Sequence, residues 1–165
     1  MSQAAHLTPR EGRKLLYTTL KLIHILLAIT AVGFNLSYTV WLMRSQKLPK
    51  EITTFALRGV KFMDDRIANP AYALLLVSGL LMVFTGPWQL TTRWIEIAIG
   101  AFVVLVLVGG LGYTPALRNQ IRALESDGPN SQAYLAASRR QTIFAIALAP
   151  VVVFILYLMV FKPFS

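Results

Sequence analysis

The sequence contains no cysteine among its 165 residues. Disulfide bonds, thiolate metal ligands, iron–sulfur clusters and covalently attached c-type haem are therefore excluded. Charged side chains are also scarce: they make up 14% of the chain, whereas hydrophobic residues make up 56% and the mean hydropathy is +0.59. This composition is too apolar for an ordinary soluble domain of this length, so it indicates an integral membrane protein.

Acidic residues are few as well. Asp and Glu number 7 against 16 Lys and Arg, which gives a net charge of +9. The basic residues gather at the ends of apolar segments, where Lys and Arg contact anionic lipid headgroups and set orientation. No basic stripe interleaves with exposed aromatic residues, as single-strand nucleic-acid binding would require. The expected partner is therefore the lipid bilayer and not nucleic acid.

Four apolar segments occupy most of the chain, and a helix crosses the hydrocarbon layer with about 20 residues. The sequence thus predicts an all-α fold, a single domain 1–165 with four transmembrane helices in an antiparallel bundle. The helices are expected at about 17–43, 71–86, 93–112 and 141–161. The two long connections keep helical spacing of apolar residues, which predicts two amphipathic helices at the membrane surface.

Sequence signals for a helix start precede the second span and the second amphipathic helix. Asn69-Pro70 is typical of an N-cap followed by a first helical residue, so the second span should begin there. The cap and the turn into that span are expected to comprise Asp64, Asp65, Arg66 and Asn69. Thr114-Pro115 should likewise end the third span and start the second amphipathic helix.

The distribution of basic residues predicts the orientation. Ten of the 16 Lys and Arg lie in the two long connections: Arg44, Lys47, Lys50, Arg58, Lys61, Arg66, Arg118, Arg122, Arg139 and Arg140. The remaining six lie on the other side: Arg10, Arg13, Lys14, Lys21, Arg93 and Lys162. The positive-inside rule therefore predicts cytoplasmic long connections and external termini.

The first apolar segment carries a stripe of polar and small residues at alternating steps of three and four: Lys21, His24, Ala28, Ala31, Asn35 and Tyr38. This spacing places them on one face of a helix. The first and third spans run in the same direction, so a buried polar cluster is expected from Lys21, His24, Arg93 and Glu96. Structural ion pairing and a ligand-binding or proton-handling function both remain open for it. Interhelical polar contacts are expected for Asn35, Tyr38 and Ser78.

Cofactor and metal sites have little support from the sequence. Ligation of b-type haem by two histidines needs two membrane histidines, whereas the chain has only His6, in the polar N-terminal tail, and His24. Haem b through His24 would need a Met or a partner subunit as second ligand. No His and carboxylate cluster has the spacing of a metal site, so no metal is expected. The sequence contains no complete catalytic constellation.

Four segments carry a family resemblance: Leu22-Ile23-His24-Ile25-Leu26, Arg58-Gly59-Val60-Lys61-Phe62-Met63-Asp64-Asp65-Arg66-Ile67-Ala68-Asn69-Pro70, Gly112-Tyr113-Thr114-Pro115 and Met159-Val160-Phe161-Lys162-Pro163. Over nearly its whole length the chain resembles a widespread bacterial family of predicted four-helix integral membrane proteins of unknown function. This resemblance implies the four-span topology and a bacterial cytoplasmic membrane, with no activity attached. More remotely, the first segment is similar to those of the four-helix protoporphyrinogen oxidase and of copper-resistance membrane domains.

Three functions are consistent with these features. Small extramembrane mass and small-residue faces favour an accessory or scaffold subunit of a homo-oligomer or larger membrane complex. The alternatives are a small haem-linked or other redox enzyme that uses His24, and a small-solute or proton carrier along the Lys21 to Tyr38 stripe.

Overall fold

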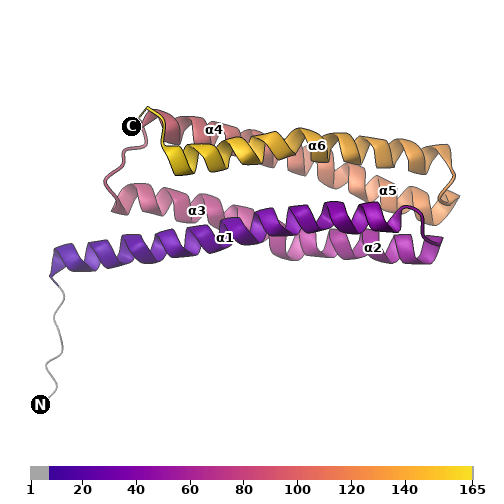
Figure 1. Ribbon diagram of the computed structural model, residues 1–165, viewed down its shortest axis with the longest axis horizontal. Coiled ribbons are helices and arrows are strands. Elements are labelled where there is room, and N and C mark those ends of the chain that lie inside the picture. Colours follow the sequence, from indigo (N-terminus) through magenta and orange to yellow (C-terminus); the bar gives the residue numbers. More distant parts are fainter. Residues whose placement is uncertain (1–7, 165) are drawn as a thin grey trace, which may run out of the picture.

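The chain folds as an elongated bundle of four long helical rods, shown by a computed structural model that describes residues 8–164 (Figure 1). The first rod is α1 (Pro9–Ser45) and the last is α6 (Gln132–Phe161). The second and third rods are each built of two α-helices joined through a π-helical turn: α2 (Lys50–Met63), η1 (Asp64–Ala68) and α3 (Asn69–Thr85), then α4 (Arg93–Val108), η2 (Gly109–Tyr113) and α5 (Thr114–Asp127). The expected all-α fold with four helices long and apolar enough to span a membrane is confirmed.

The two amphipathic segments are helical, but they do not lie along a membrane surface. α2 continues into α3 and α4 continues into α5, so each rod is 35 or 36 residues long. The apolar faces of α2 and α5 pack against each other and against α1 and α6. The apolar faces of α2 and α5 are therefore buried against other helices and not against lipid. The amphipathic pattern predicts an apolar face but does not tell which of these two surroundings covers it.

The expected caps at Asn69 and Thr114 are replaced by the two π-helical turns. Asn69 and Thr114 both have right-handed helical backbone angles, and the helix continues through each of them. A proline inside a helix lacks the N–H and clashes with the preceding turn. η1 directly precedes Asn69-Pro70 and η2 directly precedes Thr114-Pro115, so a locally widened turn absorbs each proline without ending the helix.

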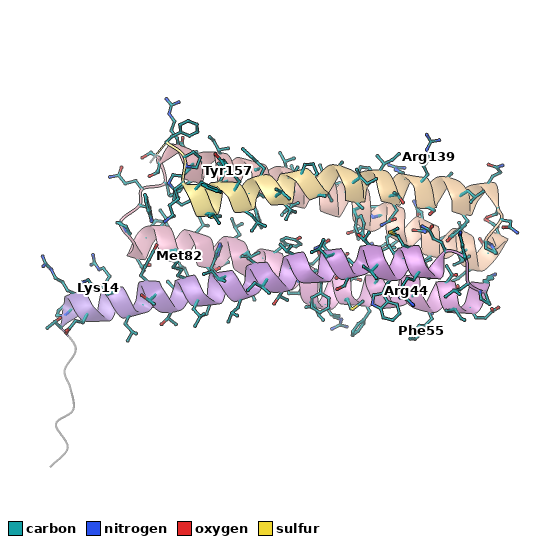
Figure 2. All side chains as sticks on the ribbon, in the orientation of Figure 1. Lys14, Arg44, Phe55, Met82, Arg139 and Tyr157 are labelled. Carbon is teal, nitrogen blue, oxygen red and sulfur yellow. The ribbon has the colours of Figure 1, made fainter. Side chains whose placement is uncertain are left out.

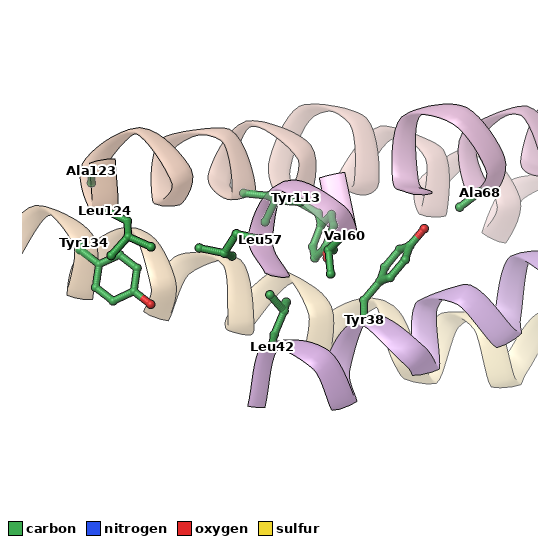
Figure 3. Close-up of a cluster of buried hydrophobic side chains, with 10 residues drawn as sticks. Tyr38, Leu42, Leu57, Val60, Ala68, Tyr113, Ala123, Leu124 and Tyr134 are labelled. Atoms are coloured by element: carbon green, nitrogen blue, oxygen red, sulfur yellow. The ribbon is translucent and has the colours of Figure 1, made fainter. Parts of the chain in front are cut away.

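The two ends of the bundle are distinguished by their links. We call the end with links 46–49 and 128–131 the connection end, and the end with link 86–92 the terminal end. The main hydrophobic core lies toward the connection end (Figure 3). It contains ten buried residues from every rod: Tyr38, Leu42, Leu57, Val60, Ala68, Tyr113, Leu117, Ala123, Leu124 and Tyr134.

Toward the terminal end the rods separate into two pairs. α1 packs on α3, and α4 packs on α6, as Figure 1 shows. Within residues 8–164, the backbone of α1 and α3 comes close to the backbone of α4 and α6 at very few points. An edge-to-face contact between Tyr72 of α3 and Phe102 of α4, with ring centroids 6.2 Å apart, joins them. We call the part of the bundle toward the terminal end the membrane half and the part toward the connection end the connection half. The membrane half consists of two helix pairs and is not a uniformly packed bundle.

Contacts between the rods set the depth of each segment. At the terminal end, three aromatic residues, one glycine and one lysine lie at the same level and contact one another: Tyr17, Trp88, Trp94, Gly86 and Lys162. Toward the connection end, Gly112 lies against Phe144, and the Arg140 guanidinium lies over the same ring at 5.8 Å. About 20 helical residues, or about 30 Å, separate these levels, which matches the hydrocarbon layer. The segments between these levels are 17–36, 66–85, 93–112 and 142–161; each lies in a helix long and apolar enough to cross a membrane, and we call them the spanning segments.

Candidate functional site

The expected cluster of Lys21, His24, Arg93 and Glu96 does not come together. Lys21, Arg93 and Glu96 are all exposed. Lys21 lies on α1, which packs on α3 and α2, whereas Glu96 lies on α4, which packs on α6. Within residues 8–164 the ion pairs are Arg58–Glu125 and Lys61–Asp65, so Lys21 and Glu96 are not paired. Lys21 and Glu96 were expected to meet because they lie at similar depth, but their helices, α1 and α4, do not pack against each other.

His24 contacts α3 instead. Its Nδ1 lies 2.9 Å from the hydroxyl oxygen of Ser78, and a Cβ at Gly79 would lie 3.2 Å from its Cε1. The Ser78 hydroxyl donates to the Leu74 carbonyl oxygen at 2.7 Å, so it accepts from His24 Nδ1–H. This network assigns the neutral His24 a proton on Nδ1 and a lone pair on Nε2.

Two further residues of the α1 stripe face the bundle interior. Asn35 donates to the Tyr72 hydroxyl of α3 at 2.9 Å and to the Ala31 carbonyl at 2.8 Å. Tyr38 is 2% exposed, and within the described residues its hydroxyl has no hydrogen-bond partner. Asn35 and Ser78 thus make contacts between helices, whereas the Tyr38 hydroxyl is buried without one.

A second polar cluster, which we call the polar junction, is formed by residues in and beside the two π-helical turns, which a hydrogen bond between Thr114 and Asp64 links. Its members come from all four rods: Tyr38 of α1, Asp64 of η1, Tyr72 of α3, Tyr113 of η2, Thr114 of α5 and Gln141 of α6. Thr114 Oγ1 donates to the Asp64 carboxylate over 3.5 Å. Burial and, after it, the charge of Asp64 raise the pKa of the Tyr38 hydroxyl. Burial raises the pKa of Tyr113 to about 12, opposed by a hydrogen bond with Gln141, and Asp64 adds a smaller rise. The junction is therefore a polar layer inside the bundle.

Asp64 is the ionisable group of this layer. It is 5% exposed and precedes the spanning segment 66–85. Burial raises the pKa of the Asp64 carboxyl above its usual range and the neighbouring Asp65 adds to the rise, while Lys61 and hydrogen bonds from Thr114 and Asn69 oppose it. Lys61 forms an ion pair with Asp65 one turn away. The adjacent acids thus diverge: Asp65 is exposed and paired, and Asp64 is buried.

Sequence reasoning placed Asp64 in a surface turn and did not select Tyr72, Tyr113 or Gln141. The signal that marks the junction is the pair of polar-proline steps, Asn69-Pro70 and Thr114-Pro115, each inside an otherwise helical pattern. Such a step permits a π-helical turn as well as a helix start, and π-helical turns often occur at functional sites.

Chemistry that needs several metal ligands or an enclosed substrate cavity finds no support in the described range. No group of three His, Asp or Glu side chains lies together within residues 8–164. Shallow hollows lie on α5 and α6, lined by residues such as Arg139, Arg140 and Phe144. Arg139 and Tyr157 both project from the outer side of α6 in Figure 2. His6 lies outside the described residues.

These features define a multi-pass, all-helical integral membrane protein with a polar layer at one boundary of its spanning region. The chain belongs to the family described as "Predicted integral membrane protein (DUF2269)", which matches residues 18–163. No curated protein and no solved structure matches the chain.

Proposed function

We propose that this protein is an accessory or scaffold subunit of a membrane assembly, placed in a bacterial cytoplasmic membrane with its connection end in the cytoplasm. The orientation follows from the ten basic residues of the long connections against six on the other side. In this orientation the compact connection-end core faces the cytoplasm and the two helix pairs lie in the lipid.

The open glycines of the membrane half support this proposal. A Cβ added at Gly33 of α1 or Gly100 of α4 would meet no atom within 4 Å. Glycine costs about 0.5–1 kcal/mol in a helix relative to alanine, so glycines that serve no contact within the chain need another explanation. Small residues on exposed membrane faces permit close approach of another helix. Gly33 and Ser37, one turn apart on α1, are both exposed and form such a small-residue face.

Surface exposure in the outer helices agrees with this interpretation. Only 6% of the most apolar stretch of α1, and the same share of α6, is buried within the chain, against 22% in each of the two central rods. α1 and α6 therefore offer nearly their whole circumference to lipid or to helices of other subunits, including further copies of this chain.

The test is association after gentle detergent extraction, read by native mass analysis and by cross-linking in the membrane. Wild type should give species larger than the monomer, and Gly33→Leu and Gly100→Leu should shift them to monomer with helical content and thermal stability retained. Gly12→Leu adds the same bulk at a glycine of α1 where a Cβ would also meet no atom within 4 Å, but which lies outside the spanning segment 17–36, and it is the matched control. A stable wild-type monomer with no co-purifying protein contradicts the proposal.

A haem-linked or redox function through His24 is the second candidate, because the Nδ1–H to Ser78 bond leaves Nε2 free to ligate. A histidine oriented through its other nitrogen is the usual arrangement of an axial ligand. The residues fit one ligand of a b-type haem; Met82 follows Ser78 by one turn on α3 and is a second donor within the chain (Figure 2). Protein purified from haem-supplemented cells should show a Soret band that His24→Ala abolishes, and a colourless wild type contradicts it.

A further inference from the structure

The polar junction contains one buried hydroxyl without a hydrogen-bond partner and a buried carboxylate. Asp64 is 5% exposed and accepts a long hydrogen bond, 3.5 Å, from Thr114 and another from Asn69. The Tyr38 hydroxyl is buried and has no partner within residues 8–164. In Figure 3 this hydroxyl is directed from α1 toward the chain that carries Ala68, the last residue of the same π-helical turn as Asp64. Buried polar groups without partners are rare, and an unseen water or ion is a common reason for them.

Asp64 forms no ion pair within residues 8–164. Lys61 lies close enough to oppose the rise in the pKa of Asp64, but its ammonium group pairs with Asp65, and Arg66 is exposed. A buried carboxylate without a counter-charge costs several kcal/mol, unless it takes up a proton or a cation. One positive charge bound at the polar junction would therefore neutralise the Asp64 carboxylate.

We propose that the polar junction binds a monovalent metal cation of the Na⁺ class, held by the Asp64 carboxylate together with the hydroxyl oxygens of Tyr38 and Thr114. Carboxylate, hydroxyl and carbonyl oxygens are the ligands that hard cations prefer. A single carboxylate favours one positive charge, because divalent Ca²⁺ takes more oxygen ligands and more negative charge.

The site would lie where the connection-end core meets the helix pairs, so the cation would join the two halves of the molecule.

The test is thermal unfolding of the purified full chain in detergent, titrated with NaCl against choline chloride at constant ionic strength and mildly alkaline pH. Na⁺ should raise the melting temperature of wild type saturably, and Asp64→Asn should abolish this rise without lowering stability in choline. Asp65→Asn changes the adjacent exposed acid and should keep the response. Tyr38→Phe should raise the half-saturating Na⁺ concentration about tenfold through loss of one ligand, and Tyr134→Phe, a buried tyrosine outside the junction, should leave it unchanged.

Each arm has an outcome that overturns the site. Equal stability of wild type in Na⁺ and choline overturns it, as does a full Na⁺ response in Asp64→Asn. If Asp64→Asn does not fold, the comparison of Tyr38→Phe with Tyr134→Phe tests the site instead. Equal half-saturating Na⁺ concentrations in these two variants would overturn it. Since protons and Na⁺ compete for one carboxylate, the Na⁺ effect should shrink as the pH is lowered. Stability that follows pH at all Na⁺ concentrations alike would mean that a proton alone neutralises Asp64.

Discussion

The connection half and the membrane half of this protein are built from the same four rods but are held together differently. In the connection half, large side chains from every rod form one core, with Leu57, Leu117 and Leu124 almost completely buried. In the membrane half, many large apolar side chains are exposed, and the rods pack as two pairs.

The difference follows from the two solvents. In water, burying apolar surface is favourable by about 25 cal/mol per Å², so the amphipathic faces of α2 and α5 are driven together. In lipid the surroundings are as apolar as the side chains, so this driving force disappears and association depends on close packing and interhelical hydrogen bonds. The membrane half accordingly relies on small-residue contacts and on bonds such as His24–Ser78, and it leaves surfaces that other helices can occupy.

The largest expected effect is loss of core packing in the connection half. Leu117→Ala should destabilise the protein by about 2–5 kcal/mol, because Leu117 is fully buried and the change leaves a cavity. Leu107→Ala, at a position 52% exposed in the membrane half, should change stability by less than about 0.5 kcal/mol. Unfolding by denaturant in mixed micelles measures both. Equal effects would show that the two halves do not differ in the way described above.

Glycine substitutions should separate contacts within the chain from open faces. A Cβ at Gly112 would lie 2.6 Å from the Phe144 ring, so Gly112→Ala should destabilise by about 1–3 kcal/mol. Gly100→Ala meets nothing and should stabilise the helix by up to about 1 kcal/mol. Melting temperatures of the monomeric protein in detergent would show opposite signs. A loss of stability in Gly100→Ala under those conditions would mean that α4 packs there within the chain.

The apolar segments predicted the spans because about 20 apolar residues in a row have few other uses. The sequence misled at the proline steps, where Asn69-Pro70 has the local preference of a helix start. The packing of α2 on α1 and α5 extends the helix past that preference, and the π-helical turn of η1 accommodates Pro70. Tertiary contacts decided between two locally acceptable outcomes.

For the site, the stripe on α1 correctly marked the face that meets other helices, as Asn35 shows. The identity of its neighbour could not be read from depth, because α3 and α4 both present residues at the level of His24. Bringing Tyr38 close to Asp64 required the continuation of α2 into α3, which puts Asp64 inside the bundle. A buried site made by four rods depends on helix order around the bundle, and one sequence does not encode that order in any local pattern.

The smallest predicted effect concerns the polar contacts of α1. The bond between His24 and Ser78 should contribute a coupling energy of about 0.6–1 kcal/mol, typical of a hydrogen bond between membrane helices. A double-mutant cycle of His24→Ala and Ser78→Ala, followed by unfolding in micelles, measures it. The cycle of Lys21→Ala and Glu96→Gln should be additive, since α1 packs on α3 and α4 on α6. Coupling between Lys21 and Glu96 that persists in the monomer would contradict the two-pair arrangement, whereas coupling found only in associated protein would place the pair between copies.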